Sequence, residues 1–277
     1  MDEKTLISIE HLLATWVKRL RTKEPATVAI LCRGSFARRE PEPWSDLDLD
    51  LLFTDRQIDE YRSAFGEPFY PHPPGVTPTP TANTPPLHVT IACRTLSDRL
   101  REIAEPCESE AWAFFLEARE RARLLWVRPD LRDQIPEEIT VKYRLSPQLQ
   151  DLLECAAKVR NSLLRGDSLG ARLAARDLAV HVPALVALAN PPVCVETRRG
   201  ALAAALAFRI APPAYHERLL CCLGLTEDRP ANLADQALEL ARGTVELLKP
   251  RAQEIASQLE PGLADALADG TLDRLLA

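Results

Sequence analysis

The segment SDLDLDLLF at residues 45–53 constrains the fold more than any other part of the chain, because aspartate and leucine alternate along it. A period of two predicts a β-strand, in which successive side chains point to opposite faces. One face would carry Asp46, Asp48 and Asp50, and the other would carry leucines for a core. Three carboxylates on one face repel one another when no counter-charge is near. The strand therefore predicts either a solvated acidic face or a site for a cation.

A glycine–serine turn precedes the acidic strand at short range. The apolar run at 26–32 predicts a buried strand that leads into Gly34 and Ser35, and ten residues separate Ser35 from Asp46. Glycine lets a backbone approach a phosphate closely, and a serine hydroxyl with nearby N–H groups can hold phosphate oxygens. Magnesium usually takes one or two carboxylates together with substrate phosphates, so Asp46 and Asp48 suit it.

The surrounding segments predict that a mixed α/β half comes first in the chain. Eight prolines in a stretch of 19 residues exclude regular structure there and predict a loop. Elsewhere, apolar residues at helical or alternating spacing predict the elements. We expect helices at 3–20, 55–65 and 97–124, strands at 26–32, 45–53, 87–96 and 124–127, and the proline-rich loop at 68–86.

The second half of the chain reads as helical throughout. A proline-containing stretch at 129–146 marks the expected domain boundary. Gly166 predicts the end of one helix, and either Asp167 or Ser168 can cap the next. The expected helices are 147–165, 168–190, 196–210, 213–223, 229–248 and 250–269.

The segment GSFARREPEPWSDLDLDLLF at 34–53 resembles the DNA polymerase β-like nucleotidyltransferase superfamily, most closely its minimal and aminoglycoside-type members. The resemblance implies an α+β fold, in which a small mixed-sheet nucleotidyltransferase domain precedes an all-α helical bundle. We place the first domain at 1–143 and the second, a HEPN-like or substrate-binding domain, at 144–277.

The same resemblance implies a reaction and its site. Asp46 and Asp48 would bind two magnesium ions, and Gly34 and Ser35 would hold the triphosphate of ATP. A hydroxyl of a small molecule or of a protein would attack the α-phosphate in line and release pyrophosphate. The expected activity is thus that of a nucleotidyltransferase, and more closely of an adenylyltransferase.

One position departs from the family's pattern. The superfamily usually supplies a third carboxylate from a later strand, and His88 stands where that acid is expected, with Thr90 further along the same face. Three interpretations stay open. His88 serves as base or ligand, since neutral imidazole can do both. Asp50 supplies the charge as a further metal ligand. Or the site is weak or inactive, and the protein only binds or senses a nucleotide.

The segment 152–190 resembles the helical C-terminal domains of antibiotic-modifying nucleotidyltransferases and the related HEPN-type bundles. The resemblance implies that Lys158 contacts the triphosphate, although an ordinary solvated lysine fits the pattern equally well. Arg38 and Arg39 could also neutralise phosphate charge, although either fits an ordinary surface arginine equally well. Arg176 and His181 match the spacing of the pair that HEPN ribonucleases use, which leaves open a toxin–antitoxin-like fusion with ribonuclease activity.

Charge and composition limit the partners. The net charge is −6 and aromatic residues make up 5% of the chain, which argues against nucleic acid as a partner. No apolar run approaches the length of a membrane helix, and the N-terminus lacks a signal-peptide core, so we expect a soluble cytoplasmic protein. The sequence names neither the acceptor nor the oligomeric state, and a homodimer stays open.

Overall fold

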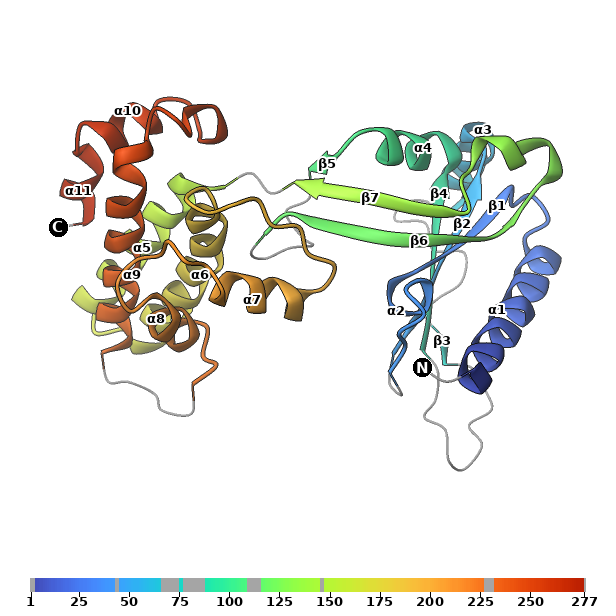
Figure 1. The fold of residues 1–277 in the computed structure, drawn as a ribbon, viewed down its shortest axis with the longest axis horizontal. Helices are drawn as coiled ribbons and strands as arrows, with labels where there is room; N and C mark the ends of the chain where they lie inside the picture. Colours follow the sequence, from blue (N-terminus) through green and yellow to red (C-terminus); the bar gives the residue numbers. More distant parts are fainter. Residues whose placement is uncertain are drawn as a thin grey trace. The chain divides into compact units, whose positions relative to one another are not determined.

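The computed structural model describes residues 3–42, 45–65, 75–76, 88–108, 116–144, 147–226 and 232–276. The chain divides into two compact units, which we call the sheet unit and the helical unit (Figure 1). The sheet unit comprises Met1–Cys107 and Arg119–Lys142, and the helical unit comprises Glu108–Ala118 and Tyr143–Ala277. As limits of independently folding domains, 1–143 and 144–277 stay predictions.

The sheet is mixed, as the sequence predicts. Its strands lie in the order β3-β4-β2-β1-β6-β7-β5. β2 and β4 run parallel, whereas β1 is antiparallel to both β2 and β6. The strands are β1 (Ala29–Arg33), β2 (Leu47–Phe53), β3 (Gly75–Val76), β4 (His88–Thr95), β5 (Cys107–Glu108), β6 (Ala118–Val127) and β7 (Glu138–Arg144).

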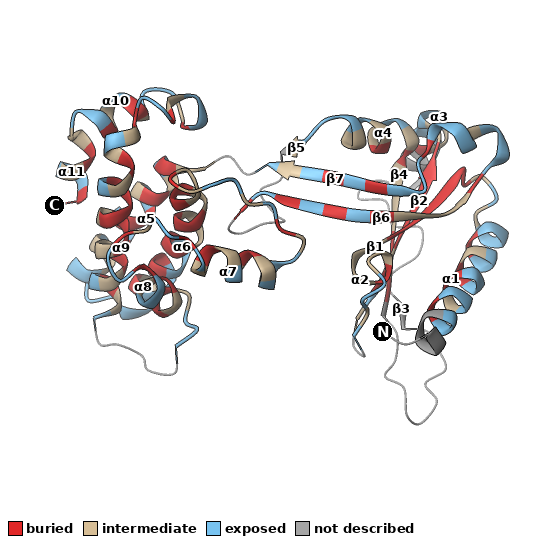
Figure 2. Cartoon of the chain, viewed as in Figure 1, coloured by how far each residue is buried: buried red, intermediate tan, exposed pale blue. Residues whose placement is uncertain are grey.

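Helices complete the sheet unit, and one of them covers the apolar face of the sheet. Every third or fourth residue of α1 is buried, and the buried stripe packs with the leucines of β2 in one core (Figure 2). The stripe consists of Ile9, Leu13, Trp16 and Leu20. The helices of this unit are α1 (Glu3–Lys23), α2 (Gly34–Ala37), α3 (Asp55–Phe65), α4 (Leu96–Ala104) and the 3₁₀ helix η1 (Pro129–Gln134).

The opposite face of the sheet carries the aspartates. Asp48 is paired in register with Arg33 of β1 and with Thr90 of β4, so these three side chains share one face. α4 contributes to this face, because its Arg99 contacts Asp50. The alternation in the sequence therefore places leucines in the core and carboxylates on the other side.

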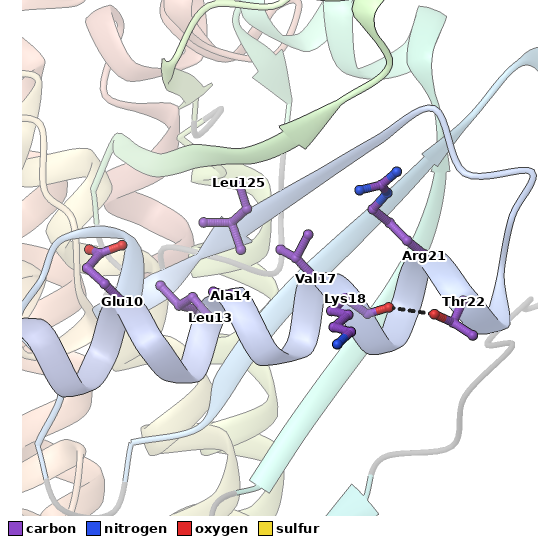
Figure 3. Close-up of a pocket in the computed structure, with 8 residues that line it drawn as sticks. All are labelled: Glu10, Leu13, Ala14, Val17, Lys18, Arg21, Thr22 and Leu125. Carbon is purple, nitrogen blue, oxygen red and sulfur yellow. Dashed lines mark hydrogen bonds between the residues drawn. The ribbon is translucent and has the colours of Figure 1, made fainter.

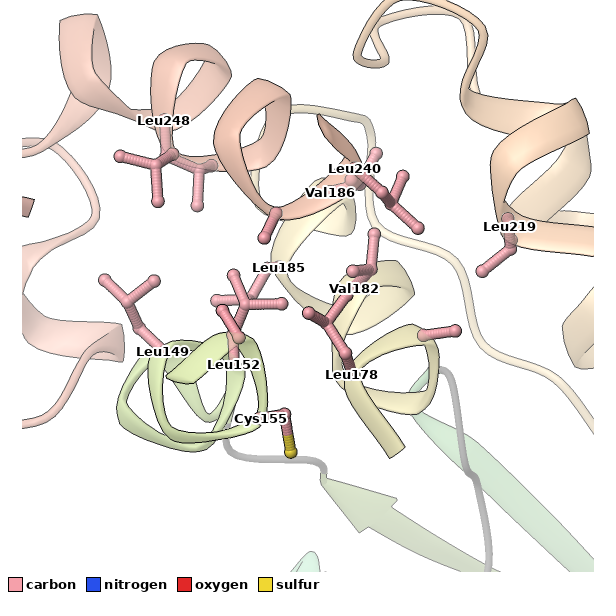
Figure 4. Packing of buried hydrophobic residues seen from close by; sticks show 14 of the residues in the cluster. Leu149, Leu152, Cys155, Leu178, Val182, Leu185, Val186, Leu219, Leu240 and Leu248 are labelled. Atoms are coloured by element: carbon pink, nitrogen blue, oxygen red, sulfur yellow. The ribbon is translucent and has the colours of Figure 1, made fainter. Parts of the chain in front are cut away.

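The helical unit has a separate core. Leu152 of α5, Leu178 and Val182 of α6 and Leu240 of α9 belong to one buried cluster (Figure 4). Of the two predicted caps, Asp167 is the one that caps α6, because it accepts a hydrogen bond from the N–H of Gly170. The elements are α5 (Leu149–Leu164), α6 (Ser168–Ala187), α7 (Arg198–Leu206), α8 (Tyr215–Cys222), α9 (Leu233–Leu248), η2 (Lys249–Arg251), η3 (Ala256–Gln258), α10 (Leu263–Ala268) and α11 (Thr271–Leu276). Among the residues that the structure describes, no helix has the length and apolar character needed to cross a membrane.

The predicted helix at 97–124 is wrong at 105–108 and from Ala118 on, and residues 109–115 lie outside the described part of the chain. α4 ends at Ala104, and β6 begins at Ala118. The first residues of β6 alternate between buried and exposed, which is strand periodicity. The arginines and the glutamate of this segment favour helices, so its composition predicts a helix despite the alternation. The predicted strand at 124–127 is the end of β6.

Four smaller differences concern element limits. The predicted boundary stretch at 129–146 contains β7, whose Ile139 and Val141 are buried. The acidic strand begins at Leu47, so Asp46 directly precedes it. The predicted helix at 250–269 is broken into η2, η3 and α10. The proline-rich loop lies outside the described residues except for Gly75–Val76, which forms β3.

Candidate active site

The glycine turn and the acidic strand meet directly. Gly34 follows the last residue of β1 and has a φ of +64°, a left-handed conformation that glycine adopts without strain. A Cβ atom at this position would lie 2.9 Å from Oδ2 of Asp48. Two separate features therefore favour glycine at this position: the left-handed backbone conformation and the closeness of the Asp48 carboxylate.

Asp46 and Asp48 form a pair of carboxylates that differ in exposure. Asp46 is exposed, whereas Asp48 is half-buried on β2. Burial and then the negative charge of Asp46 raise the pKa of Asp48, and Arg33 partly opposes this rise. The two carboxylates therefore repel each other when both are charged, and a bound divalent cation would offset this repulsion.

Asp50 has a different environment from the other two aspartates. Its side chain is fully buried, and Arg33, Arg94 and Arg99 all contact it. Arg33 Nε lies 2.8 Å from Oδ1, Arg94 Nε lies 3.5 Å from Oδ2, and Arg99 Nη2 donates to Oδ2. Guanidinium groups thus stand around both oxygens. We therefore propose that Asp50 is an anchor of an ion-pair network, in place of the predicted metal ligand.

A carboxylate that sequence reasoning missed stands on the same face. Glu120 of β6 is 5% exposed and accepts a hydrogen bond from Arg33 Nη1 at 2.9 Å. Its charge also raises the pKa of Asp48, which shows that the two groups are electrostatically coupled. In the sequence, Ala118, Glu120 and Ala122 alternate with three arginines, a period of two that is typical of a strand. The prediction of a helix at 97–124 conceals this period.

The other predicted residues of the sheet unit are placed as follows. Ser35 is the second residue of α2 and is half-buried. Arg38 directly follows α2, and its Nε lies 3.5 Å from the carboxylate of Glu40. The backbone of His88 lies in β4 and pairs with Val76, but its side chain is outside the described part of the structure. The predicted role of His88 therefore stays a prediction.

Three predicted residues lie in the helical unit. Lys158 of α5 is exposed and forms an ion pair of 2.8 Å with Glu154, one turn earlier. On α6, Arg176 is exposed and His181 is half-buried. Neither the triphosphate contact of Lys158 nor the ribonuclease pair is tested by these positions.

A hollow of about 590 Å³ lies on the other face of the sheet, along α1 (Figure 3). Leu13 and Val17 of α1 and Leu125 of β6 form its apolar part, and Lys18 and Arg21 give it positive charge. Gly34 and Asp48 are not among its lining residues. This hollow is therefore separate from the carboxylate face.

Comparison with known proteins identifies the helical part. Residues 148–250 match the family model of the nucleotidyltransferase substrate-binding domain. This part of the chain is similar to the substrate-binding domains of nucleotidyltransferases. The match confirms the resemblance to nucleotidyltransferases with a helical C-terminal domain, and it supports nucleotidyl transfer as the general function. A search of curated proteins found no match to the sequence.

Gly34 allows a sharp test, because Gly166 provides a matched control. Both have a positive φ, of +64° and +66°, but a Cβ at Gly166 would have no heavy atom within 4 Å. We expect Gly34→Ala and Gly166→Ala each to lose about 1–2 kcal/mol of unfolding free energy from backbone strain. Gly34→Ala alone should also displace Asp48 and weaken magnesium-dependent binding of an ATP analogue. Urea unfolding and calorimetry measure the two effects, and equal binding by both variants would contradict the prediction.

Proposed function

We propose that this protein transfers a nucleoside monophosphate, AMP from ATP, to a hydroxyl of a small molecule or a protein and releases pyrophosphate. The observation that carries the proposal is the packing of the Gly34 turn against the carboxylate of Asp48. This arrangement occurs in a chain whose residues 148–250 match the family model of the nucleotidyltransferase substrate-binding domain. A phosphate-holding turn beside a carboxylate pair is the chemistry that transfer from a triphosphate requires.

The carboxylates suit magnesium. Within the described residues, no cluster of three or more histidine, cysteine, aspartate or glutamate side chains could hold a metal ion. Asp46 and Asp48 would therefore bind magnesium as a pair, with triphosphate oxygens completing its coordination, which is the usual arrangement for this ion. Two magnesium ions, when bound, would offset charge on the attacking and leaving oxygens.

The residues of the turn would orient the triphosphate. Gly34 presents backbone without a side chain, so a phosphate can come close to it. The Ser35 hydroxyl can donate to a phosphate oxygen, and the Arg38 guanidinium can offset its charge. The acceptor hydroxyl would then attack the α-phosphorus opposite the pyrophosphate, so that the new P–O bond forms as the bond to pyrophosphate breaks.

Glu120 is our candidate for the third carboxylate of the site. It lies on the carboxylate face, it is coupled to Asp48, and it is held by Arg33. A carboxylate there can accept the proton of the acceptor hydroxyl or keep that hydroxyl oriented for attack. This role is the one that sequence reasoning gave to His88 or Asp50.

Paired substitutions distinguish the candidates. We expect Glu120→Gln to lower the rate of transfer by about 10²-fold, as loss of a general base does, while His88→Ala changes it by less than about threefold. The reverse ranking would return the role to His88. Rates are compared at saturating ATP and magnesium, so that a difference in nucleotide binding does not enter.

Labelled ATP tests the function itself. The full-length protein is incubated with α-labelled ATP and magnesium, with the protein itself and a panel of aminoglycosides as acceptors, and pyrophosphate release is followed in parallel. Label on an acceptor supports the proposal. Binding of an ATP analogue without release of pyrophosphate would instead favour a nucleotide sensor, and no binding at all would refute both.

A further inference from the structure

Arg33 joins the two carboxylate-bearing strands that flank β1. Its Nε lies 2.8 Å from Asp50 Oδ1 on β2, and its Nη1 donates to Glu120 Oε1 on β6 at 2.9 Å. The side chain is only 16% exposed, so water competes little for either contact. One guanidinium group therefore links three neighbouring strands on the carboxylate face, which the planar, multi-donor geometry of arginine allows.

The Asp50 end of this link is fixed. Asp50 is fully buried and is also bound by Arg99, which is itself 1% exposed and paired with Glu102. Burial alone would lower the pKa of Arg33, but the charges of Asp50 and Glu120 outweigh it and raise that pKa. Arg33 is thus permanently charged and held in one place by a buried partner.

The backbone of Arg33 leads directly into the turn of the candidate site. The next residue is Gly34, whose missing Cβ leaves room for Asp48 Oδ2, and Arg33 is paired in register with Asp48. A displacement of Arg33 would therefore change the distance between the turn and Asp48. It would also release Glu120 from its hydrogen bond.

We propose that Arg33 is the positioning residue of the site: anchored on Asp50, it fixes Glu120 and the Gly34–Ser35 turn relative to Asp48. This inference rests on the proposed nucleotidyl transfer. Arg33 acts in this role without contacting the substrate. Asp50 is the anchor on the carboxylate face, and Glu120 and the Gly34–Ser35 turn are the groups that the anchored Arg33 holds in place.

Arg94 provides the matched control for a test. It lies half-buried on β4, and its ion pairs within the described part of the chain are with Asp50, at 3.5 Å, and with Glu102. Arg33→Met and Arg94→Met remove the same charge from the neighbourhood of Asp50. Only the first removes the link to Glu120.

The first measurement needs no activity. In amide ¹H–¹⁵N spectra of the full-length protein, we expect Arg33→Met to shift the signals of Asp48 and Glu120, which are not its neighbours in the chain, and Arg94→Met to leave them in place. Unchanged signals in Arg33→Met would overturn the proposal. If Arg33→Met does not fold, Arg33→Lys replaces it, because lysine keeps the charge but cannot bridge two carboxylates in the same geometry.

The second measurement separates positioning from simple stability. Rates are measured with magnesium, ATP and the acceptor that the labelled-ATP assay identifies. Arg33→Met should lower kcat by about 10²-fold and change KM for ATP less than threefold, because the reacting groups are misplaced while ATP still binds. Arg33→Lys should recover about tenfold of that loss. An equal loss of kcat in Arg94→Met would overturn the proposal. If the wild-type protein labels no acceptor, the proposed function fails, and the amide spectra still decide the role of Arg33.

Discussion

Asp48→Asn should lower nucleotidyl transfer from magnesium-bound ATP by at least about 10²–10³-fold, the loss typical of removing one preorganised charge that acts in the transition state. Asp48 contributes the half-buried carboxylate that faces the Gly34 turn, and Asp46 lies two residues earlier. Asparagine keeps the shape of the side chain but cannot carry the negative charge that magnesium requires. Label transfer from ATP to the acceptor measures the effect.

The same substitution should leave the protein as stable as the wild type or more stable. Burial and Asp46 both disfavour the charged form of Asp48, so a neutral amide relieves a cost that the folded state carries. Loss of activity without loss of stability is the expected signature of a functional carboxylate. A matched control is Asp98→Asn on α4, whose exposed ion pair with Arg101 lies outside the candidate site. If Asp48→Asn transferred nucleotide at the wild-type rate, this site assignment would fail.

The sequence predicts correctly the elements whose apolar residues recur with a regular spacing. The alternation of aspartate and leucine predicts β2 and its two faces, and the spacing of Leu13, Trp16 and Leu20 predicts the buried stripe of α1. The position of Gly34 at the end of a buried strand could be predicted for the same reason. These patterns depend on residues close together in the sequence, so they predict the elements without knowledge of what packs against them.

The same local reasoning failed where distant residues decide the structure. β6 contains three arginines and one glutamate within its first six residues, and every second residue from Ala118 to Ala122 is buried. Glu120 is buried because Arg33, 87 residues earlier, pairs with it. Periodicity alone cannot reveal such a partner, and helix propensity then outweighs the weak alternation.

Asp50 shows that the strand pattern cannot distinguish the environments of the three aspartates. Its position in the strand places it on one face with Asp46 and Asp48, and the sequence therefore suggests one role for all three. The structure brings three arginines from separate segments onto Asp50 alone. A shared face is a property of the strand, whereas the role of each carboxylate depends on what approaches it.

Asp50→Ala should destabilise the protein by about 3–5 kcal/mol, which is the usual cost of removing one partner of a buried ion pair. Arg99 would be left buried without the carboxylate of Asp50, and Arg33 would keep its ion pair with Glu120. Urea unfolding of the full-length protein measures the change in free energy. Asp98→Ala, which removes only an exposed pair with Arg101, should cost less than about 1 kcal/mol.

Magnesium separates the two roles that the sequence left open for Asp50. If Asp50 is an anchor, the Asp50→Ala variant has the same loss of unfolding free energy with and without magnesium, because the arginines that Asp50 contacts are part of the fold. If it is a metal ligand, the variant is nearly as stable as the wild type without magnesium and lacks only the stabilisation that the ion adds. The buried contacts of Asp50 with Arg33 and Arg99 lead us to expect the first result. A loss seen only in the presence of magnesium would restore Asp50 to the metal site and would remove the anchor on which the positioning role of Arg33 depends.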